Sequence, residues 1–231
     1  MGSRLVALAC DARDPGQLAR FWAGLLGRDL VGDARGPLLP GPPGEVALRF
    51  VPSDSVKSGQ SRVHLHVTSE TPEHQAASVA RALDLGGHHV DVGQRPEEGH
   101  VVLADPEGNE LCVIEAGNAF LAGCGLLGEL ACDGTRAVGV FWSQALDWPL
   151  VWDQDEETAV QSPVGGTKIA WGGPPLVPKH GPNRQRLELA TDDLDAEADR
   201  LVALGATRLA TYDGHVELAD PSGNELWLTV P

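Results

Sequence analysis

Eight histidines are the residues of this sequence best suited to acid–base or metal chemistry, because imidazole titrates near neutral pH and binds metals. His64 and His66 stand in the apolar string VHLHV, and we expect only one of them, His64, to face a binding site. His100 and His215 each open an apolar run that leads into the same string, LADP. For these two, contact with a ligand and a structural role at the start of a strand are equal alternatives.

No compact catalytic motif accompanies the histidines. The sequence contains no glycine-rich phosphate loop, nucleophile elbow, HExxH or CxxC. Glu110 and Glu225 share a GNE string, for which we expect a role in stabilising a turn rather than in catalysis. Three classes of protein stay open: a small-molecule binder, an enzyme that acts on a bound organic molecule, and a structural scaffold.

The elements that must position these residues occur in a repeat. Three strings appear twice in the same order: LACD at 8–11 and 130–133, Phe-Trp at 21–22 and 141–142, and LADPxGNEL at 103–111 and 218–226. Such matched landmarks indicate an internal duplication. The sequence therefore predicts two homologous domains, residues 1–117 and 118–231, each near the most common domain size.

Apolar periodicity predicts that each half contains two βαβββ modules. Helices are expected at 15–26, 72–85, 137–146 and 193–204, with Asp14 as an N-cap and Gly27 as a C-terminal stop for the first. Strands are expected at 5–10, 29–31, 45–51, 63–68, 88–92, 100–104, 111–115, 126–132, 186–190, 215–219 and 226–230. The stretch GPLLPGPPG at 36–44 is expected to form turns, and DQDEET at 153–158 a solvated hairpin tip.

Composition limits the choice of partners. With 33 acidic and 17 basic residues, the net charge of −16 repels phosphate backbones, so we expect no nucleic-acid partner. No apolar run is long enough for a bilayer and no signal sequence is evident, which predicts a cytoplasmic protein without membrane contact. The four cysteines are expected to be buried thiols rather than disulfides, and a homodimer is left open.

Three longer strings carry a resemblance to a known family. DARDPGQLARFWAGLLG, VHLHVTSETPEH and DPEGNEL together resemble the vicinal oxygen chelate superfamily, in its glyoxalase-like and bleomycin-resistance-like branch. The resemblance covers nearly the whole chain. It implies an α+β fold of tandem glyoxalase-like domains, in which four βαβββ modules form two half-barrel cups that hold the ligand.

The resemblance also implies where a metal would bind. Members that catalyse usually hold a divalent metal with His and Glu side chains from the first and last strands of the modules. In the first half these positions fall on Ala7, His64 and Cys112, with Arg49 near a fourth-strand position. His64 opposite Cys112 leaves three alternatives: packing or a hydrogen bond to a ligand, a thiolate–imidazole pair, or a weak two-ligand metal site.

In the second half the same positions fall on Glu129 (or Leu127), Arg186 and Trp227, with Trp171 near the fourth-strand position. Neither guanidinium nor indole is a practical metal ligand, because the first stays protonated and the second only donates. We therefore expect degenerate metal sites and no cofactor. A divalent metal held through His64 is the alternative.

The function predicted from these features is binding of a small organic molecule, such as an antibiotic or metabolic intermediate that the protein sequesters. The alternative is a glyoxalase- or dioxygenase-like enzyme, and no catalytic residue is assigned. We expect Arg49 and His64 to line a first-half cup, and Trp171, Arg186 and Trp227 to line a second-half cup. The full set of candidate ligand-binding residues is Arg49, His64, His100, Cys112, Glu129, Trp171, Arg186, His215 and Trp227.

Overall fold

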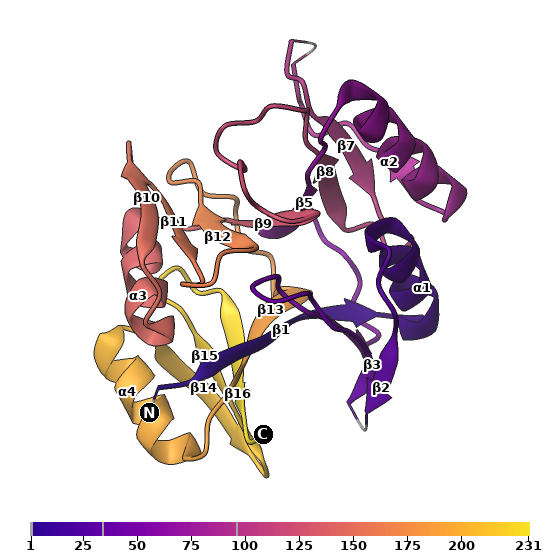
Figure 1. Ribbon diagram of the computed structural model, residues 1–231. Helices are drawn as coiled ribbons and strands as arrows, with labels where there is room; N and C mark the ends of the chain where they lie inside the picture. Colours follow the sequence, from indigo (N-terminus) through magenta and orange to yellow (C-terminus); the bar gives the residue numbers. More distant parts are fainter. Residues whose placement is uncertain (1, 34, 96) are drawn as a thin grey trace.

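Two mixed eight-stranded sheets form the protein in a computed structural model that describes residues 2–33, 35–95 and 97–231 (Figure 1). Four βαβββ modules follow one another along the chain, as the repeat predicts. Module 1 comprises β1 (Arg4–Ala12), α1 (Pro15–Leu26), β2 (Val31–Asp33), β3 (Gly36–Leu39) and β4 (Leu48–Pro52); module 2 comprises β5 (Val63–Val67), α2 (Pro72–Asp84), β6 (His88–His89), β7 (Val101–Ala104) and β8 (Glu110–Val113). Module 3 comprises β9 (Leu127–Cys132), α3 (Arg136–Leu146), β10 (Leu150–Gln154), β11 (Glu157–Gln161) and β12 (Lys168–Trp171); module 4 comprises β13 (Gln185–Ala190), α4 (Leu194–Leu204), β14 (Thr207–Tyr212), β15 (His215–Ala219) and β16 (Glu225–Thr229).

Each sheet combines modules from the two halves of the sequence. Sheet A has the strand order β14-β15-β16-β13-β1-β4-β3-β2 and so joins modules 4 and 1. Sheet B has the order β10-β11-β12-β9-β5-β8-β7-β6 and joins modules 3 and 2. The α+β fold with four modules and two cups is confirmed. The expectation that each half of the chain lines its own cup is wrong, because strand pairing crosses between the halves.

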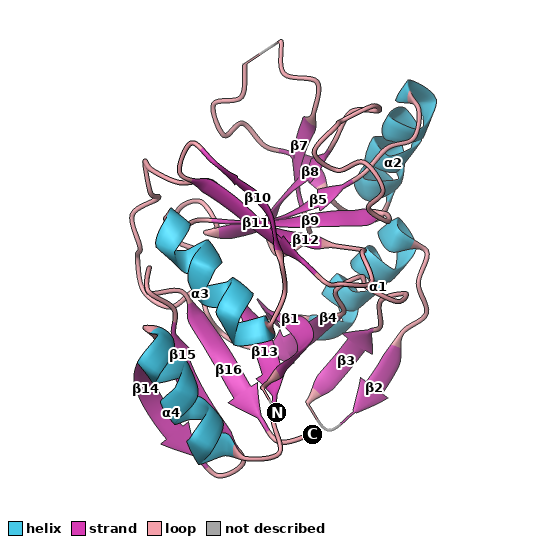
Figure 2. Ribbon diagram, turned by 60° about the vertical axis from the view of Figure 1, so that its left-hand side comes forward, coloured by secondary structure: helices cyan, strands magenta, loops and turns pink. Residues whose placement is uncertain are grey.

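The helices pack on one face of each sheet and leave the other face concave (Figure 2). Local signals explain their bounds: Asp14 accepts a hydrogen bond from the backbone N–H of Gln17, and Gly27 ends α1 in the left-handed conformation. None of the helices in the described ranges is long and apolar enough to span a bilayer. The turn at the tip of β10 and β11 is confirmed, with Asp155 and Glu156 both at positive φ.

The repeated Phe-Trp and DPxGNE strings meet in the interior. Trp22 is 1% exposed and its Nε1 donates to Oδ2 of Asp105 at 3.3 Å. Trp142 makes the equivalent bond with Asp220, also at 3.3 Å. Each aspartate additionally accepts backbone and side-chain N–H groups of the asparagine four residues later. The duplicated motif therefore fastens a turn of one module to the helix of its neighbour.

Strand β3 lies inside the stretch that the sequence predicts as turns. Leu39 of this strand is fully buried, and it pairs with Leu48 of β4. The gain from burying leucine in the core outweighs the local preference of the surrounding glycines and prolines for turns. The boundary at 117/118 falls in the segment that connects β8 with β9 and stays a prediction.

Candidate functional site

A row of four side-chain positions crosses the middle of sheet B. In the strand register, Lys168 of β12 lies opposite Glu129 of β9, Glu129 opposite His66 of β5, and His66 opposite Cys112 of β8. The row alternates with buried leucines and valines that point toward the helices, since side chains alternate between the faces of a strand. It therefore belongs to the concave face.

His66 is the centre of this row. Its Nδ1 lies 2.6 Å from Oε2 of Glu129, and its side chain is only 16% exposed. Burial alone would lower the pKa of His66, but the neighbouring Cys112 side chain and the hydrogen-bonded carboxylate of Glu129 outweigh burial and raise the pKa to about 10. Burial and the neighbouring charge of His66 lower the pKa of His64 to about 3. His64 is therefore the weaker base of the two imidazoles.

Both histidines of VHLHV face the same side, and the expectation that only His64 does so is wrong. Their ring centroids are 4.9 Å apart. Residues two apart on a strand share a face. His66 therefore lies one row further along the strand than His64, about 7 Å along the strand axis. The row that contains Glu129 and Cys112 also contains His66. The ligand position that the sequence predicts at His64 therefore lies two residues further along the strand, at His66.

A cavity of about 480 Å³ opens beside this row. Its lining includes the polar side chains of His64 and Glu129 and the aromatic rings of Phe120 and Trp152. The two aromatic rings meet edge to face with centroids 5.7 Å apart, and the ammonium of Lys168 lies 4.5 Å from the centre of the Phe120 ring. Phe120 comes from the segment between the halves, so sequence reasoning, which treated that segment as a boundary, did not identify it as a cavity wall.

Trp171 does not present its ring to the cup. It is 1% exposed and stacks on Trp142 of α3, with ring centroids 6.4 Å apart and an angle of 9° between the planes. Although Trp171 borders the cavity, its ring belongs mainly to the core under α3. The aromatic wall that the sequence assigned to Trp171 is provided by Trp152 and Phe120.

Sheet A has the equivalent row, but its side chains bind one another. Glu188 is fully buried, and its carboxylate accepts a hydrogen bond from Nε of Arg49 at 2.8 Å and pairs with Arg35. By the register, Glu188 lies opposite Ala7 and Trp227, just as His66 lies opposite Glu129 and Cys112. The ligand position of sheet A is thus occupied by Glu188 rather than by Arg186, and an ion pair closes it.

Arg186 and Trp227 come together beside that ion pair. The guanidinium of Arg186 lies 3.8 Å from the centre of the Trp227 ring and binds Oδ1 of Asp11 at 2.5 Å. The indole N–H of Trp227 donates to Glu217 at 3.1 Å. The sequence grouped Arg186 and Trp227 with Trp171, and Arg49 with His64. The structure instead places Arg49 with Arg186 and Trp227 in sheet A, because β5 and β12 belong to sheet B.

The two matched histidines have different surroundings. His100 lies 3.7 Å from Glu98 and close enough to His64 to affect its pKa. His215 stacks on Tyr212, with centroids 4.5 Å apart, and borders a cavity of about 580 Å³ next to Trp227. Glu110 and Glu225 pair with Lys57 and Lys179, which lie in the β4–β5 and β12–β13 connections, so they fasten those connections rather than the GNE turns.

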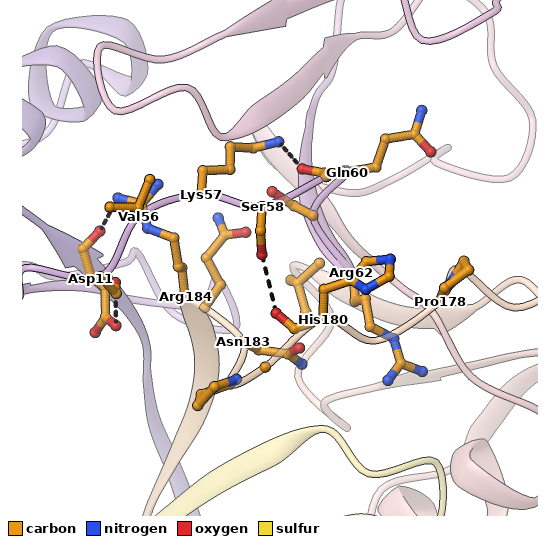
Figure 3. Close-up of a pocket in the computed structure, with 17 residues that line it drawn as sticks. Asp11, Val56, Lys57, Ser58, Gln60, Arg62, Pro178, His180, Asn183 and Arg184 are labelled. Atoms are coloured by element: carbon orange, nitrogen blue, oxygen red, sulfur yellow. Dashed lines mark hydrogen bonds between the residues drawn. The ribbon is translucent and has the colours of Figure 1, made fainter.

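A smaller cavity of about 160 Å³ lies where the β4–β5 and β12–β13 connections cross (Figure 3). Its basic side chains have carboxylate partners: Lys57 binds Glu110, Arg62 binds Asp133 and Arg184 binds Glu107. The hydroxyl of Ser58 donates to the backbone oxygen of His180 at 3.1 Å. The charged side chains of this cavity are thus paired, although Nε of Arg184 is buried without a hydrogen-bond partner among the described residues.

The side chains of sheet B fit a divalent metal, and those of sheet A do not. One ligand atom each from His64, His66 and Cys112 lies within 4.8 Å of the others. Nε2 of His66 is buried without a hydrogen-bond partner among the described residues. Two imidazoles and a thiol suit a borderline metal such as zinc, which acts as a Lewis acid when bound. In sheet A the buried carboxylate is already neutralised by arginine.

Comparisons with known proteins agree with this architecture. The family model described as glyoxalase-like domain matches residues 7–114 and 129–229, and the chain belongs to this family. Glyoxalase I from Zea mays is structurally similar, with a TM-score of 0.68 at 14% identity over 99% of this chain and 92% of that one. A putative dioxygenase from Bacillus subtilis subsp. subtilis str. 168 has a TM-score of 0.56 at 15% identity over 99% and 85%. At these identities the likeness concerns the fold alone. No curated protein matches the chain.

Proposed function

We propose that the concave face of sheet B binds a small organic molecule. The observation that carries the proposal is the cavity of about 480 Å³, whose lining includes His64, Glu129, Phe120 and Trp152. Apolar walls with a few well-placed polar groups are typical of small-molecule sites in this size range. A flat molecule that carries oxygen atoms matches this combination of aromatic and polar lining.

Sheet A is the less suitable site. Its neighbouring cavity of about 580 Å³ is bordered by Trp227 and His215 but not by the buried Arg49 or Glu188. A ligand there would meet Trp227 and Arg35, and the guanidinium of Arg35 is already paired with Glu188. We therefore propose that sheet B has the working cup and that the ion pairs of sheet A stabilise the fold.

The proposed role is binding and sequestration of an antibiotic or metabolic intermediate. A glyoxalase- or dioxygenase-like enzyme is the second candidate. What favours it is the cluster of His64, His66 and Cys112, because donors of this kind can hold a Lewis-acidic metal beside a bound substrate.

A calorimetric screen of hydroxyaromatic and carboxyaromatic fragments tests the proposal. We expect at least one fragment to bind the parent protein, and we expect Glu129→Ala or Trp152→Ala to weaken that fragment about tenfold or more, since each removes a wall of the cavity. Trp227→Ala, on the equivalent strand of sheet A, is the matched control and should leave the affinity unchanged. Absence of binding by every fragment, or binding lost only with Trp227→Ala, would place the function elsewhere.

The other partners follow from charge and composition. We also propose a cytoplasmic protein with no membrane partner and no nucleic-acid partner; the net charge of −16 supports the last point, because it repels phosphate backbones. The homodimer that the sequence leaves open can be checked by light scattering after size-exclusion chromatography.

A further inference from the structure

Three potential metal donors converge on the concave face of sheet B. His64 and His66 come from β5, where residues two apart share a face, and Cys112 comes from the adjacent parallel strand β8, opposite His66. One ligand atom from each lies within 4.8 Å of the other two. The fold therefore preassembles the three side chains.

The two ring nitrogens of His66 have different surroundings. Nδ1 is 2.6 Å from the carboxylate of Glu129, whereas Nε2 is buried and, among the residues described, has no hydrogen-bond partner. A buried polar atom without a partner is destabilising, and a bound metal would supply the missing partner. Histidines that bind metals commonly use one nitrogen for the metal and give the other to a carboxylate, which orients the ring. His66 and Glu129 have this arrangement.

The chemistry of the donors selects the metal class. Two imidazoles and one thiolate suit zinc and similar borderline cations, whereas magnesium and calcium prefer sets of oxygen ligands. Cys112 is 7% exposed and packs with Val102, Ile114 and Leu121, so the sulfur is shielded from bulk solvent. His64 borders the cavity, which leaves access for a further ligand from that side.

We propose that His64, His66 and Cys112 form a three-ligand site for a zinc-class divalent cation, with Glu129 orienting His66 and the cavity supplying the remaining position. This proposal replaces the expectation of a metal-free protein, which was based on only one usable ligand. It differs from the His and Glu pattern implied by the resemblance, since two donors share one strand, the third is a thiolate and the carboxylate does not bind the metal. It rests on the proposed function only in assigning the open position to the organic ligand.

Cobalt(II) is the probe for this site, because its absorption reports both geometry and sulfur ligation. Chelator-treated, reduced full-length protein should bind one equivalent of Co²⁺ and develop a thiolate-to-cobalt charge-transfer band in the near ultraviolet. Cys112→Ser should abolish that band, and His64→Ala or His66→Ala should weaken binding about tenfold or more. Glu129→Gln should keep the band and weaken binding about 10–100-fold, as expected for a positioning residue.

Cys124→Ser is the matched control. Cys124 is partly buried and packs against the same apolar cluster as Cys112, but it is not one of the three donors. This variant should retain the band and the affinity. A band that survives Cys112→Ser and disappears with Cys124→Ser would overturn the proposed ligand set, as would the absence of saturable cobalt binding by the parent protein.

X-ray absorption of the zinc-loaded parent protein avoids dependence on variants that fold poorly. It should show one sulfur and at least two imidazole nitrogens around zinc, and a shell without sulfur would overturn the proposal. Fragment binding is measured separately on the metal-free protein. Failure of metal binding and failure of the organic-ligand site are therefore distinguishable outcomes.

Discussion

Nδ1 of His66 lies 2.6 Å from Oε2 of Glu129, across the seam at which the two halves of the sequence join in sheet B. His66 belongs to β5 and Glu129 to β9, so each half contributes one member of the pair. In sheet A the residue opposite Glu188 of β13 is Ala7 of β1, and Arg49 of β4 reaches across β1 to bind Glu188. The duplicated modules thus yield two concave faces with different chemistry, one with histidines beside a cavity and one closed by an ion pair.

The two tryptophans that border the sheet B cavity should respond differently to substitution. Trp171→Phe removes part of a buried stack with Trp142 and should lower the free energy of unfolding by about 1–2 kcal/mol with little change in fragment affinity. Trp152→Phe should weaken fragment binding and leave stability nearly unchanged, since Trp152 is only partly buried. Urea unfolding and calorimetry together measure both effects, and a reversed pattern would assign the cavity wall to Trp171.

Glu188→Gln should destabilise the protein strongly. The substitution removes the carboxylate that binds the guanidinium of Arg49, which is only 2% exposed, and breaking a buried ion pair costs about 3–5 kcal/mol. Urea unfolding measures the loss. Glu217→Gln on the same sheet is the control, because Glu217 is partly exposed and should cost less than about 1 kcal/mol. Equal losses in the two variants would contradict a buried ion pair at Glu188.

The repeated aspartates should contribute equally to stability. Asp105→Ala and Asp220→Ala each leave several buried N–H groups without their acceptor, including that of Trp22 or Trp142, and should cost about 2–3 kcal/mol in urea unfolding. Asp213→Ala, on the exposed tip between β14 and β15, should cost little. A large loss at only one of the two repeats would show that the halves do not use the motif in the same way.

Glu197 should make stability depend on pH. Burial disfavours its charge, but hydrogen bonds from Arg200 and from the backbone of Ser3 prevail and lower the pKa of Glu197 below its ordinary value of 4.5. A lowered pKa in the folded state adds stability that is present above pH 4.5 and is lost as pH falls through the folded-state pKa.

Glu197→Gln therefore removes that contribution, which we expect to be about 1 kcal/mol at pH 7 because solvent screens part of the interaction. The difference in unfolding free energy between parent and variant should shrink as pH falls below 4.5. Asp199→Asn, on the exposed side of the same helix, is the control. Its unfolding free energy should differ little from that of the parent both at pH 7 and below pH 4.5. A gap between parent and Glu197→Gln that is independent of pH would contradict the lowered pKa.

Local features of the sequence determined the modules and most of their elements. Asp14 and Gly27 delimit α1 through capping, which depends on residues within one or two turns. Burial alternates along VHLHV, as in a strand that has one side facing the helices. This pattern too depends only on residues that are close together in the sequence. The repeat of Phe-Trp and DPxGNE predicted equivalent structural units, and Trp22 and Trp142 have matching partners.

Only the tertiary structure decided which modules share a sheet, and hence which side chains meet. His66 and Glu129 are 63 residues apart and Arg49 and Glu188 are 139 apart, and no local pattern specifies either pairing. A register difference of two residues keeps a side chain on the same face, so periodicity could not distinguish His64 from His66. Long-range strand pairing resolves that difference, because burial of the helix-facing rows and the hydrogen bonds between strands select one neighbour and one register for each strand.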